Sequence, residues 1–297
     1  MHPAPSVIVF TVLSGLGFGL LFFLGLGLPT VTGWAAFFYY ALGFGLAVVG
    51  LLSSTLHLGN PQRAWRAFSQ WRSSWLSREA VLSVAALSIL GVHGAAAVFL
   101  GRTLDSVGYL GAVFALATVV ATAMIYGQLR TVPRWNQWLT PVLFVVAMVT
   151  GGAILAGQTG VALALLPLLL LAQAAHWWRG DRRLGETGTT LGTATGLASL
   201  GRVRLLEPPH TGKNYLLKEM GFEVGRKHAG RLRMITVIAL AALPFAVLAL
   251  APAGLIATAT AAMLHVLGLF CGRWLFFAEA EHVQAIYYGQ HGTPRVT

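Results

Sequence analysis

The sequence predicts an all-α integral membrane protein, a bundle of eight transmembrane helices with large cytoplasmic connectors. Of its 297 residues, 56% are hydrophobic and only 10% are charged, whereas about 25% of the residues of a soluble domain are charged. The apolar residues form runs long enough to cross a hydrocarbon core of roughly 30 Å, which takes about 20 helical residues. Strand-like alternation is missing, and lipid tolerates no unpaired backbone groups, so each run is expected to be a helix.

Eight apolar runs follow one another along the sequence. They are Val7–Leu28, Phe37–Leu56, Ala80–Leu100, Val107–Tyr126, Leu139–Ala156, Val161–Ala175, Met234–Leu250 and Leu255–Phe277. The sixth barely reaches spanning length, and only a short turn, Gly157–Gly160, separates it from the fifth. We expect one membrane domain over residues 1–297, in which residues 176–233 form a connector too long for a passive link and suited to docking a partner.

Nearly all the positive charge lies on one side of these predicted spans. Every Lys and Arg except Arg102 falls in the connectors 58–79, 127–138 and 176–233 or toward the C-terminal end. Because cytoplasmic loops are enriched in Lys and Arg, this side and both termini are expected to be cytoplasmic. The net charge of +11 suits anionic lipid and an acidic partner, and its place along a membrane surface argues against nucleic-acid binding. The predicted docking residues are Arg66, Arg72, Arg134, Lys218, Arg226 and Lys227.

The connector Leu56–Glu79 gathers aromatic and ionisable residues between two apolar runs. Asn60-Pro61 is a favourable helix start, because Asn caps exposed amides and Pro suits the first helical position. The aromatic residues that follow recur every three or four positions, which predicts one face of a helix. They are Trp65, Phe68, Trp71 and Trp75. An amphipathic helix in the lipid headgroup zone accounts for them without any further function.

His57 and Glu79 stand at the two ends of this connector, where a hairpin would bring them to the same side of the membrane. A quinone takes up two protons with two electrons, so its site needs groups that exchange protons. His titrates near neutrality, and a glutamate can carry the second proton. The simpler readings are an interfacial imidazole and a carboxylate favoured by the helix dipole. We predict a quinone site at this pair.

Four further residues are predicted to shape the quinone site. Arg63, Arg78 and Trp75 belong to the same connector, and Tyr126 ends the fourth run on the face that also carries Arg130. Tyr126 would form a second wall of the pocket, although an aromatic belt at the membrane boundary explains it equally.

Haem and iron–sulfur cofactors are the alternatives to quinone. His93 and His265 lie deep in the third and eighth runs and are candidate axial ligands of a b-type haem, or buried imidazoles bonded across helices. Arg273 could meet a haem propionate, a quinone oxygen or a lipid phosphate. Cys271 is the single cysteine. An iron–sulfur cluster or a structural zinc site needs several cysteine or histidine ligands, so neither is expected in this sequence.

A small-solute permease is the alternative from another class. Transporters often carry inverted repeats or buried carboxylates. No internal repeat is evident, and no acidic residue lies deep in a predicted span. These observations weaken the permease hypothesis without removing it.

Three segments together resemble the membrane-anchor subunits of the DMSO reductase family. They are "HLGNPQRAWRAF…SSWLSRE" (His57–Glu79), "TAMIYGQLRTVPRWNQW" (Thr122–Trp138) and "KNYLLKEMGFEVGRKHAGRLR" (Lys213–Arg233). The resemblance covers nearly the whole sequence. It implies a bacterial inner-membrane protein in a three-subunit electron-transport complex of anaerobic respiration or sulfite oxidation, with a ferredoxin-like iron–sulfur subunit and a molybdopterin catalytic subunit.

The resemblance also implies a role for this protein within the complex. The anchor exchanges electrons with quinone at the histidine and glutamate that match His57 and Glu79. It holds no complete active site for the terminal substrate, and such anchors are regarded as lacking haem. Because the basic side is expected in the cytoplasm, the anchor of the cytoplasm-facing sulfite dehydrogenase is the closer type, and a quinol-oxidising DMSO reductase anchor is the alternative.

Overall fold

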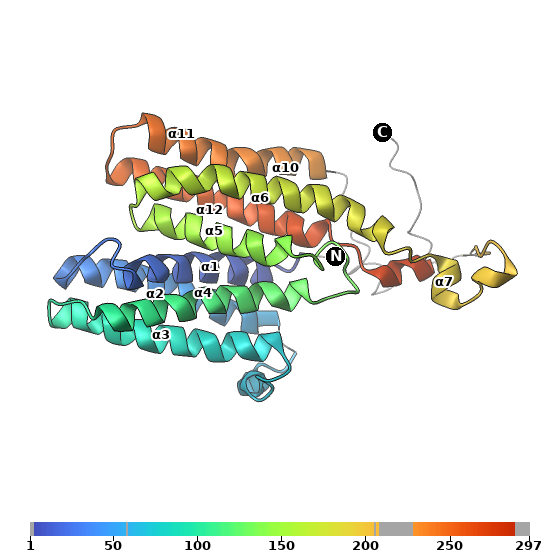
Figure 1. Ribbon diagram of the computed structural model, residues 1–297, viewed down its shortest axis with the longest axis horizontal. Helices are drawn as coiled ribbons and strands as arrows, with labels where there is room; N and C mark the ends of the chain where they lie inside the picture. Colours follow the sequence, from blue (N-terminus) through green and yellow to red (C-terminus); the bar gives the residue numbers. More distant parts are fainter. Residues whose placement is uncertain (1–2, 58, 205, 208–227, 289–297) are drawn as a thin grey trace.

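The computed structural model describes residues 3–57, 59–204, 206–207 and 228–288, and the secondary structure of these residues is helical. Long antiparallel helices lie side by side in one elongated bundle (Figure 1). The long helices are α1 (Pro5–Gly25), α2 (Gly33–Ser53), α3 (Trp75–Phe99), α4 (Asp105–Gly127), α5 (Leu139–Leu155), α6 (Thr159–Glu186) and α12 (Leu255–Ala278). The remaining member is the continuous segment α10 (Ala229–Val237), η4 (Ile238–Ala242) and α11 (Leu243–Leu250).

Seven of these helices, within the described residues, are long and apolar enough to cross a membrane. The protein is therefore a multi-pass membrane protein. The exception is α5, whose 17 residues extend about 25 Å at 1.5 Å per residue. The prediction of eight spans is thus confirmed for seven of them. The remaining apolar helix, α5, falls just short of spanning length.

The sixth run differs most from its prediction. It was expected to end at Ala175, yet α6 continues through 28 residues to Glu186. The apolar run ends where polar and charged side chains begin. The helical backbone continues because Asp181 pairs with Arg134 and because Arg183 donates to the Asn136 carbonyl at the bundle end. The connector predicted over 176–233 is correspondingly helical at both ends, and α7 (Leu191–Thr195) and η3 (Ala198–Leu200) lie between them.

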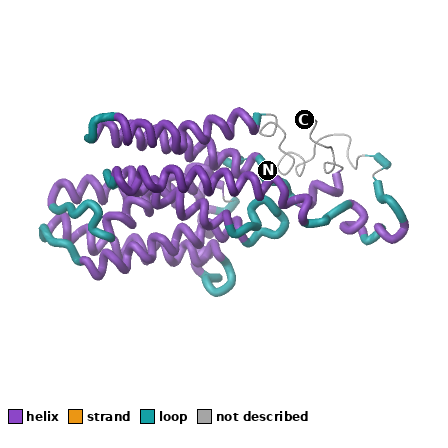
Figure 2. The backbone as a smooth tube through the Cα atoms, turned by 45° about the horizontal axis from the view of Figure 1, so that its top comes forward, coloured by secondary structure: helices purple, strands orange, loops and turns teal. Residues whose placement is uncertain are grey.

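The connections differ strongly between the two ends of the bundle. One end carries η1 (Ser54–His57), η2 (Pro61–Phe68), residues 128–138, α7 and η5 (Val283–Tyr288), and it is the right-hand end in Figure 1. We call it the connector end. In Figure 2 the described backbone is drawn almost entirely as helix, with loops at the two bundle ends. The longer connections among the described residues thus lie at one end of the bundle.

Helix α1 lies at the centre and packs on α2, α4, α5 and α12. Close backbone contacts hold it there: a Cβ at Gly17 would overlap the backbone of Ala47, and one at Gly19 would overlap the carbonyl of Met148. Apolar helices gain little hydrophobic energy from one another in lipid, so small residues that permit close packing stabilise such contacts. This packing places α1 beside α4, α5 and α12, which contribute to the cavity described below.

Candidate functional site at the connector end

The sequence predicted that Glu79 would stand just before the beginning of a helix. The structure places it inside helix α3. Ser74 caps the helix by accepting a hydrogen bond from the Ser77 amide at 3.5 Å, so α3 starts at Trp75 and Glu79 is on its second turn. The side chain is only 4% exposed, and its Oε1 accepts a hydrogen bond from Thr122 Oγ1 of α4. It makes no ion pair with a described residue. A buried carboxyl group is thereby held between α3 and α4.

Thr122 gives this carboxyl group a partner in both protonation states. Its Oγ1 also lies 3.0 Å from the Thr118 carbonyl oxygen. A hydroxyl group has one hydrogen to donate and lone pairs that accept. Thr122 can therefore donate to the Glu79 carboxylate or, with its hydrogen turned to Thr118, accept from the protonated carboxyl. Glu79 can change its protonation state without losing its hydrogen bond.

Tyr126, which was predicted to form a second wall of the quinone pocket, lies one turn beyond Thr122 on α4. Its ring is buried and packs on Trp135 and Phe144, with centroid separations of 5.3 and 5.9 Å. Its ring centroid also lies 5.5 Å from those of Phe276 and Phe277 on α12, the helix that carries Arg273. The structure thus places Tyr126 one turn from the partner of Glu79. Arg273 of α12, for which a quinone oxygen was one of the predicted partners, contacts Phe144 of the same aromatic group.

The connector residues of the predicted site have different surroundings. Arg78 lies over the Trp75 ring at 4.4 Å. Its guanidinium also donates to the carbonyls of Trp71 and Arg72 at 3.1 and 2.7 Å, respectively. It therefore fastens the connector to the start of α3. Arg63 is exposed on η2.

His57 is the last residue of η1, directly after α2. The end of α2 and the beginning of α3 share the connector end, as the hairpin prediction required. The side chain of His57 is outside the described part of the structure, so the predicted meeting of His57 with Glu79 stays a prediction.

The aromatic connector does not form the single helix that its spacing predicted. The 3₁₀ helix η2 ends at Phe68, residues 69–74 turn, and α3 begins at Trp75. Trp65, Phe68 and Trp71 remain exposed at 67%, 45% and 54%. Exposed aromatic rings beside arginines at the end of a membrane bundle fit the lipid headgroup zone.

A small cavity adjoins Thr122 in the bundle interior. Its volume is about 20 Å³, enough for roughly one water molecule. The polar groups and the glycine that line it are Thr11, Ser14, Gly15, Thr122 and Arg273. Arg273 is 7% exposed, and its guanidinium carbon lies 3.4 Å from the centroid of the Phe144 ring. We call this space the α1–α12 cavity.

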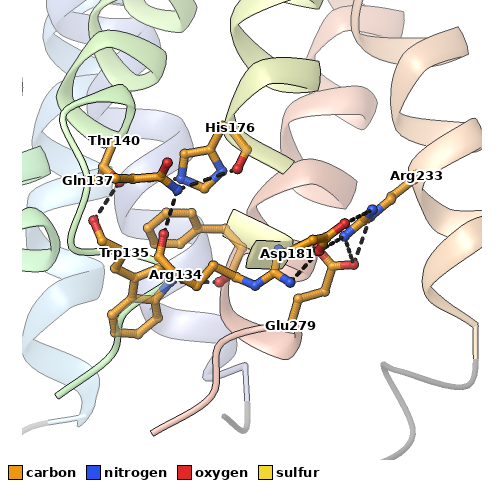
Figure 3. A network of polar contacts seen from close by, with 9 residues as sticks. Arg134, Trp135, Gln137, Thr140, His176, Asp181, Arg233 and Glu279 are labelled. Carbon is orange, nitrogen blue, oxygen red and sulfur yellow. Dashed lines mark hydrogen bonds and ion pairs between the residues drawn. The ribbon is translucent and has the colours of Figure 1, made fainter. Parts of the chain in front are cut away.

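A second polar group at the connector end consists of Arg134, Asp181, Arg233 and Glu279, which we call the ion-pair cluster (Figure 3). Asp181 Oδ1 lies 2.5 Å from Arg134 Nη2 and 2.8 Å from Arg233 Nη2. Glu279 completes the cluster, 2.7 Å from Arg233 Nη2 and 3.5 Å from Arg134 Nη1. Two cations and two anions thus join the 128–138 loop, α6, α10 and the end of α12.

The predicted docking residues are placed unequally. Arg66 and Arg72 are exposed, each with its guanidinium near its neighbouring Trp ring, at 5.6 and 5.5 Å. Arg134 is buried in the ion-pair cluster, where its guanidinium pairs with Asp181 and Glu279. Lys218, Arg226 and Lys227 are within 208–227, outside the described residues.

The two deep histidines occupy separate sites. Gly108 lies beside both His93 and Gly25, whereas Gly151 lies beside both His265 and Leu16. Gly25 and Leu16 are nine residues apart on α1, about 13 Å along the axis, so the rings do not face each other across one iron. Each Nδ1 instead meets a carbonyl oxygen, Leu104 for His93 at 3.1 Å and Leu240 for His265 at 2.7 Å. Among the described residues no three His, Cys, Asp or Glu side chains form a possible metal site.

Sequence reasoning missed the ion-pair cluster and the α1–α12 cavity. Asp181 and Glu279 are two of only nine acidic residues, and both stand next to span ends, which was the available signal. Their hydrogen-bonded partners are 46 to 52 residues away in sequence, and the ion pair of Glu279 with Arg134 joins positions still farther apart. No spacing rule connects such positions. Ser14 and Thr11 look like ordinary small polar residues of a membrane helix.

Comparisons with known proteins agree with one another. The family model for the DMSO reductase anchor subunit (DmsC) matches residues 1–167. A sulfite dehydrogenase subunit of Allochromatium vinosum is 33% identical over 97% of this protein and 99% of its own length. An anaerobic dimethyl sulfoxide reductase chain of Escherichia coli is 31% identical over 42% of this protein and 48% of its own length. No solved structure matches.

Proposed function

Because the protein belongs to the DMSO reductase anchor subunit family, we propose that it is the quinone-reactive membrane anchor of a molybdopterin oxidoreductase. Electrons pass between the iron–sulfur subunit of the complex and membrane quinone at the connector end. The observation that carries this proposal is the buried Glu79 carboxyl group, held by Thr122 and without an ion pair to a described residue. Buried ionisable groups within a membrane bundle are expensive and generally functional.

The proposed chemistry is proton exchange coupled to electron transfer. A quinone that accepts two electrons from the iron–sulfur subunit takes up two protons and becomes the quinol, and the reverse reaction releases them. Glu79 exchanges one proton, with Thr122 as its partner in either state, and His57 exchanges the other. Tyr126 closes the inner wall, while Arg78, Trp75 and Arg63 hold and flank the connector that covers the site.

The partner subunits dock at the connector end, which faces the cytoplasm of a bacterial inner membrane by the distribution of Lys and Arg. Exposed Arg66 and Arg72 contribute to this surface, and Lys218, Arg226 and Lys227 are proposed to extend it. A basic surface favours an acidic partner and accelerates its association.

The sulfite dehydrogenase type is favoured over the DMSO reductase type. The sulfite dehydrogenase relative aligns along 97% of this protein, whereas the Escherichia coli dimethyl sulfoxide reductase relative aligns along 42%. In this type electrons run from sulfite to quinone. The purified complex should therefore reduce decylubiquinone with sulfite, and a complex that instead oxidises a quinol with dimethyl sulfoxide would establish the alternative.

Two substitutions test the proposed site in the purified complex. Glu79→Gln keeps the shape of the side chain but cannot exchange a proton, and His57→Asn removes the imidazole. General acid–base groups typically contribute about 10²–10⁴-fold, so each variant should lose at least about 100-fold in decylubiquinone turnover. Electron transfer from the soluble subunits to an artificial dye should be unchanged.

A matched control is Glu186→Gln. Glu186 is also a helical glutamate at the connector end, but it is exposed and pairs with Arg183 at 3.1 Å. Its quinone turnover should equal that of the unmodified complex. Full quinone turnover in both Glu79→Gln and His57→Asn would sink the proposed site.

A further inference from the structure

Arg273 is a buried cation whose charge the fold does not neutralise. It is 7% exposed on α12, more than one turn inside the end of the helix at Ala278. Its contacts are with aromatic faces, Phe144 at 3.4 Å and Phe276 at 5.8 Å. It has no hydrogen bond or ion pair with any residue that the structure describes. The burial also removes it from lipid phosphate, which was one of its predicted partners.

Such an arrangement is costly unless the cation has a ligand. A buried charge without a partner loses its hydration and gains no ionic interaction in return. The ion-pair cluster shows that this fold provides carboxylates for Arg134 and Arg233 (Figure 3). Arg273, with aromatic contacts only, keeps its guanidinium donors available.

The guanidinium borders the α1–α12 cavity, whose polar groups match a quinone headgroup. Arg273 lies on one wall and Thr122, the partner of Glu79, on another. Ser14 lines the space from α1 and donates to the Phe10 carbonyl at 2.6 Å, so its oxygen is available as an acceptor. Phe144 supplies an aromatic face.

Gly15 leaves the α1 side of this cavity open. A Cβ built there would meet no heavy atom within 4 Å, although the glycine lines the cavity. The present volume of about 20 Å³ is water-sized. A headgroup must therefore displace neighbouring side chains, and the missing side chain at position 15 reduces what has to move.

We propose that Arg273 binds a carbonyl oxygen of the quinone inside the α1–α12 cavity, while Glu79 serves the headgroup through Thr122. This inference rests on the proposed quinone function and moves the headgroup from the connector surface into the bundle. As electrons arrive from the iron–sulfur subunit, negative charge develops on the quinone oxygens. A guanidinium donor stabilises that charge, and the uptake of two protons, one of them by way of Glu79, then neutralises it and gives the quinol.

Two independent changes test the cavity in the purified complex, with decylubiquinone as the probe. Arg273→Gln removes the cationic donor, and Arg273→Lys restores a charge without the planar fork. Loss of a charge-assisted hydrogen bond should raise KM by at least about tenfold, and lysine should recover part of it. Gly15→Leu fills the cavity without altering any charge and should raise KM to a similar extent.

Gly45→Leu is the matched control for the cavity change. Gly45 is also a helical glycine whose added Cβ would meet no heavy atom within 4 Å, but it is exposed on α2 and lines no part of the cavity. Its KM should stay at the value of the unmodified complex. The melting temperature of every variant in detergent separates lost quinone binding from lost folding. If Arg273→Gln does not assemble into the complex, the KM of Gly15→Leu tests the cavity instead.

The outcomes separate this inference from the proposed function. If Glu79→Gln abolishes quinone turnover while Arg273→Gln and Gly15→Leu both keep an unchanged KM, the cavity proposal is overturned and the quinone function stands. If the unmodified complex does not react with decylubiquinone, the proposed function itself fails. As a readout besides turnover, a photoreactive azidoquinone should label α1 near Gly15 and α12 near Arg273. Labelling confined to the connector would contradict the cavity.

Discussion

Three arginines at the connector end of the bundle are buried or partly buried, and the fold treats them in two opposite ways. In the ion-pair cluster, Arg134 and Arg233 share Asp181 and Glu279 at 2.5–3.5 Å. In the α1–α12 cavity, Arg273 meets aromatic rings, and the nearby Glu79 bonds to Thr122 instead. Both the cluster and the cavity involve α12: Glu279 stands at the end of this helix, and Arg273 lies more than one turn inside it.

The comparison separates a structural use of charge from a functional one. Paired charges in the cluster join helices that are far apart in sequence, and each partner compensates the desolvation of the others. Arg273 lines the cavity without an ion pair to a described residue, and Glu79 bonds to Thr122, which lines it from another side. Under the proposed function, both remain able to act on a third species. Buried charge indicates a ligand site here only where the protein does not neutralise it.

The largest expected effect is on the ion-pair cluster. Asp181→Asn leaves Arg134 and Arg233 with one carboxylate between them. Breaking a buried pair costs about 3–5 kcal/mol, and because the Asp181 and Arg233 side chains are 23% and 24% exposed, the expected cost is at or below the lower end of this range. Thermal unfolding of the purified protein in detergent should show a clear loss of stability, whereas Glu186→Gln, which removes an exposed pair with Arg183, should change it by less than about 1 kcal/mol.

Arg273→Gln sharpens this contrast, because it removes a buried charge that has no ionic partner among the described residues. Its stability should equal or exceed that of the unmodified protein. Equal losses of stability for Asp181→Asn and Arg273→Gln would break the distinction between the two groups.

An intermediate effect is expected at Thr122. Thr122→Val removes the hydroxyl that bonds Glu79 but keeps the shape of the side chain, and hydrogen bonds to charged groups are worth roughly 1.5–3 kcal/mol. Decylubiquinone turnover of the complex should fall by about tenfold or more. Thr150→Val is the matched control, because Thr150 is equally buried and donates only to Val146 in its own helix, at 2.7 Å. If both valine variants behave alike, Thr122 has no special role toward Glu79.

The smallest effect is expected for charges that remain solvated. Arg66→Gln combined with Arg72→Gln should weaken association of the iron–sulfur subunit only a few-fold, since a charge at the rim of an interface contributes little affinity. The difference should vanish at high salt because exposed charges are screened. Arg102→Gln, an exposed arginine at the opposite bundle end, should leave association unchanged. If Arg102→Gln weakened association in a binding titration as much as the double variant does, the assignment of Arg66 and Arg72 to the docking surface would be wrong.

Much of the fold could be predicted because membrane helices are specified locally. Seven apolar runs match spanning helices within a few residues at most ends, and the one-sided connectors follow from where the charges stand. The predictions failed where a polar residue interrupts hydropathy but not the helix. Thus α6 runs on past Trp177 to Glu186, and α3 begins at Trp75, five residues before the predicted Ala80.

The candidate site was predictable only in part. Glu79 stood out because a carboxyl group beside a long apolar run is unusual, and its burial agrees with that expectation. Thr122 carried no such signal, since threonine is ordinary in a membrane helix. Its meeting with Glu79 depends on the packing of α3 against α4, across 43 residues of sequence.

The sequence by itself determined that this is a helical, multi-pass membrane protein with its charge at one end, because the hydrophobic effect and backbone hydrogen bonding act over short stretches. It also singled out Glu79. Only the tertiary structure decided which charges are neutralised, since Asp181 reaches Arg134 and Arg233 while no described carboxylate reaches Arg273. Whether a charge is neutralised depends on differences of a few ångströms between segments that are distant in sequence. Over such distances the Coulomb energy between two buried charges changes most steeply.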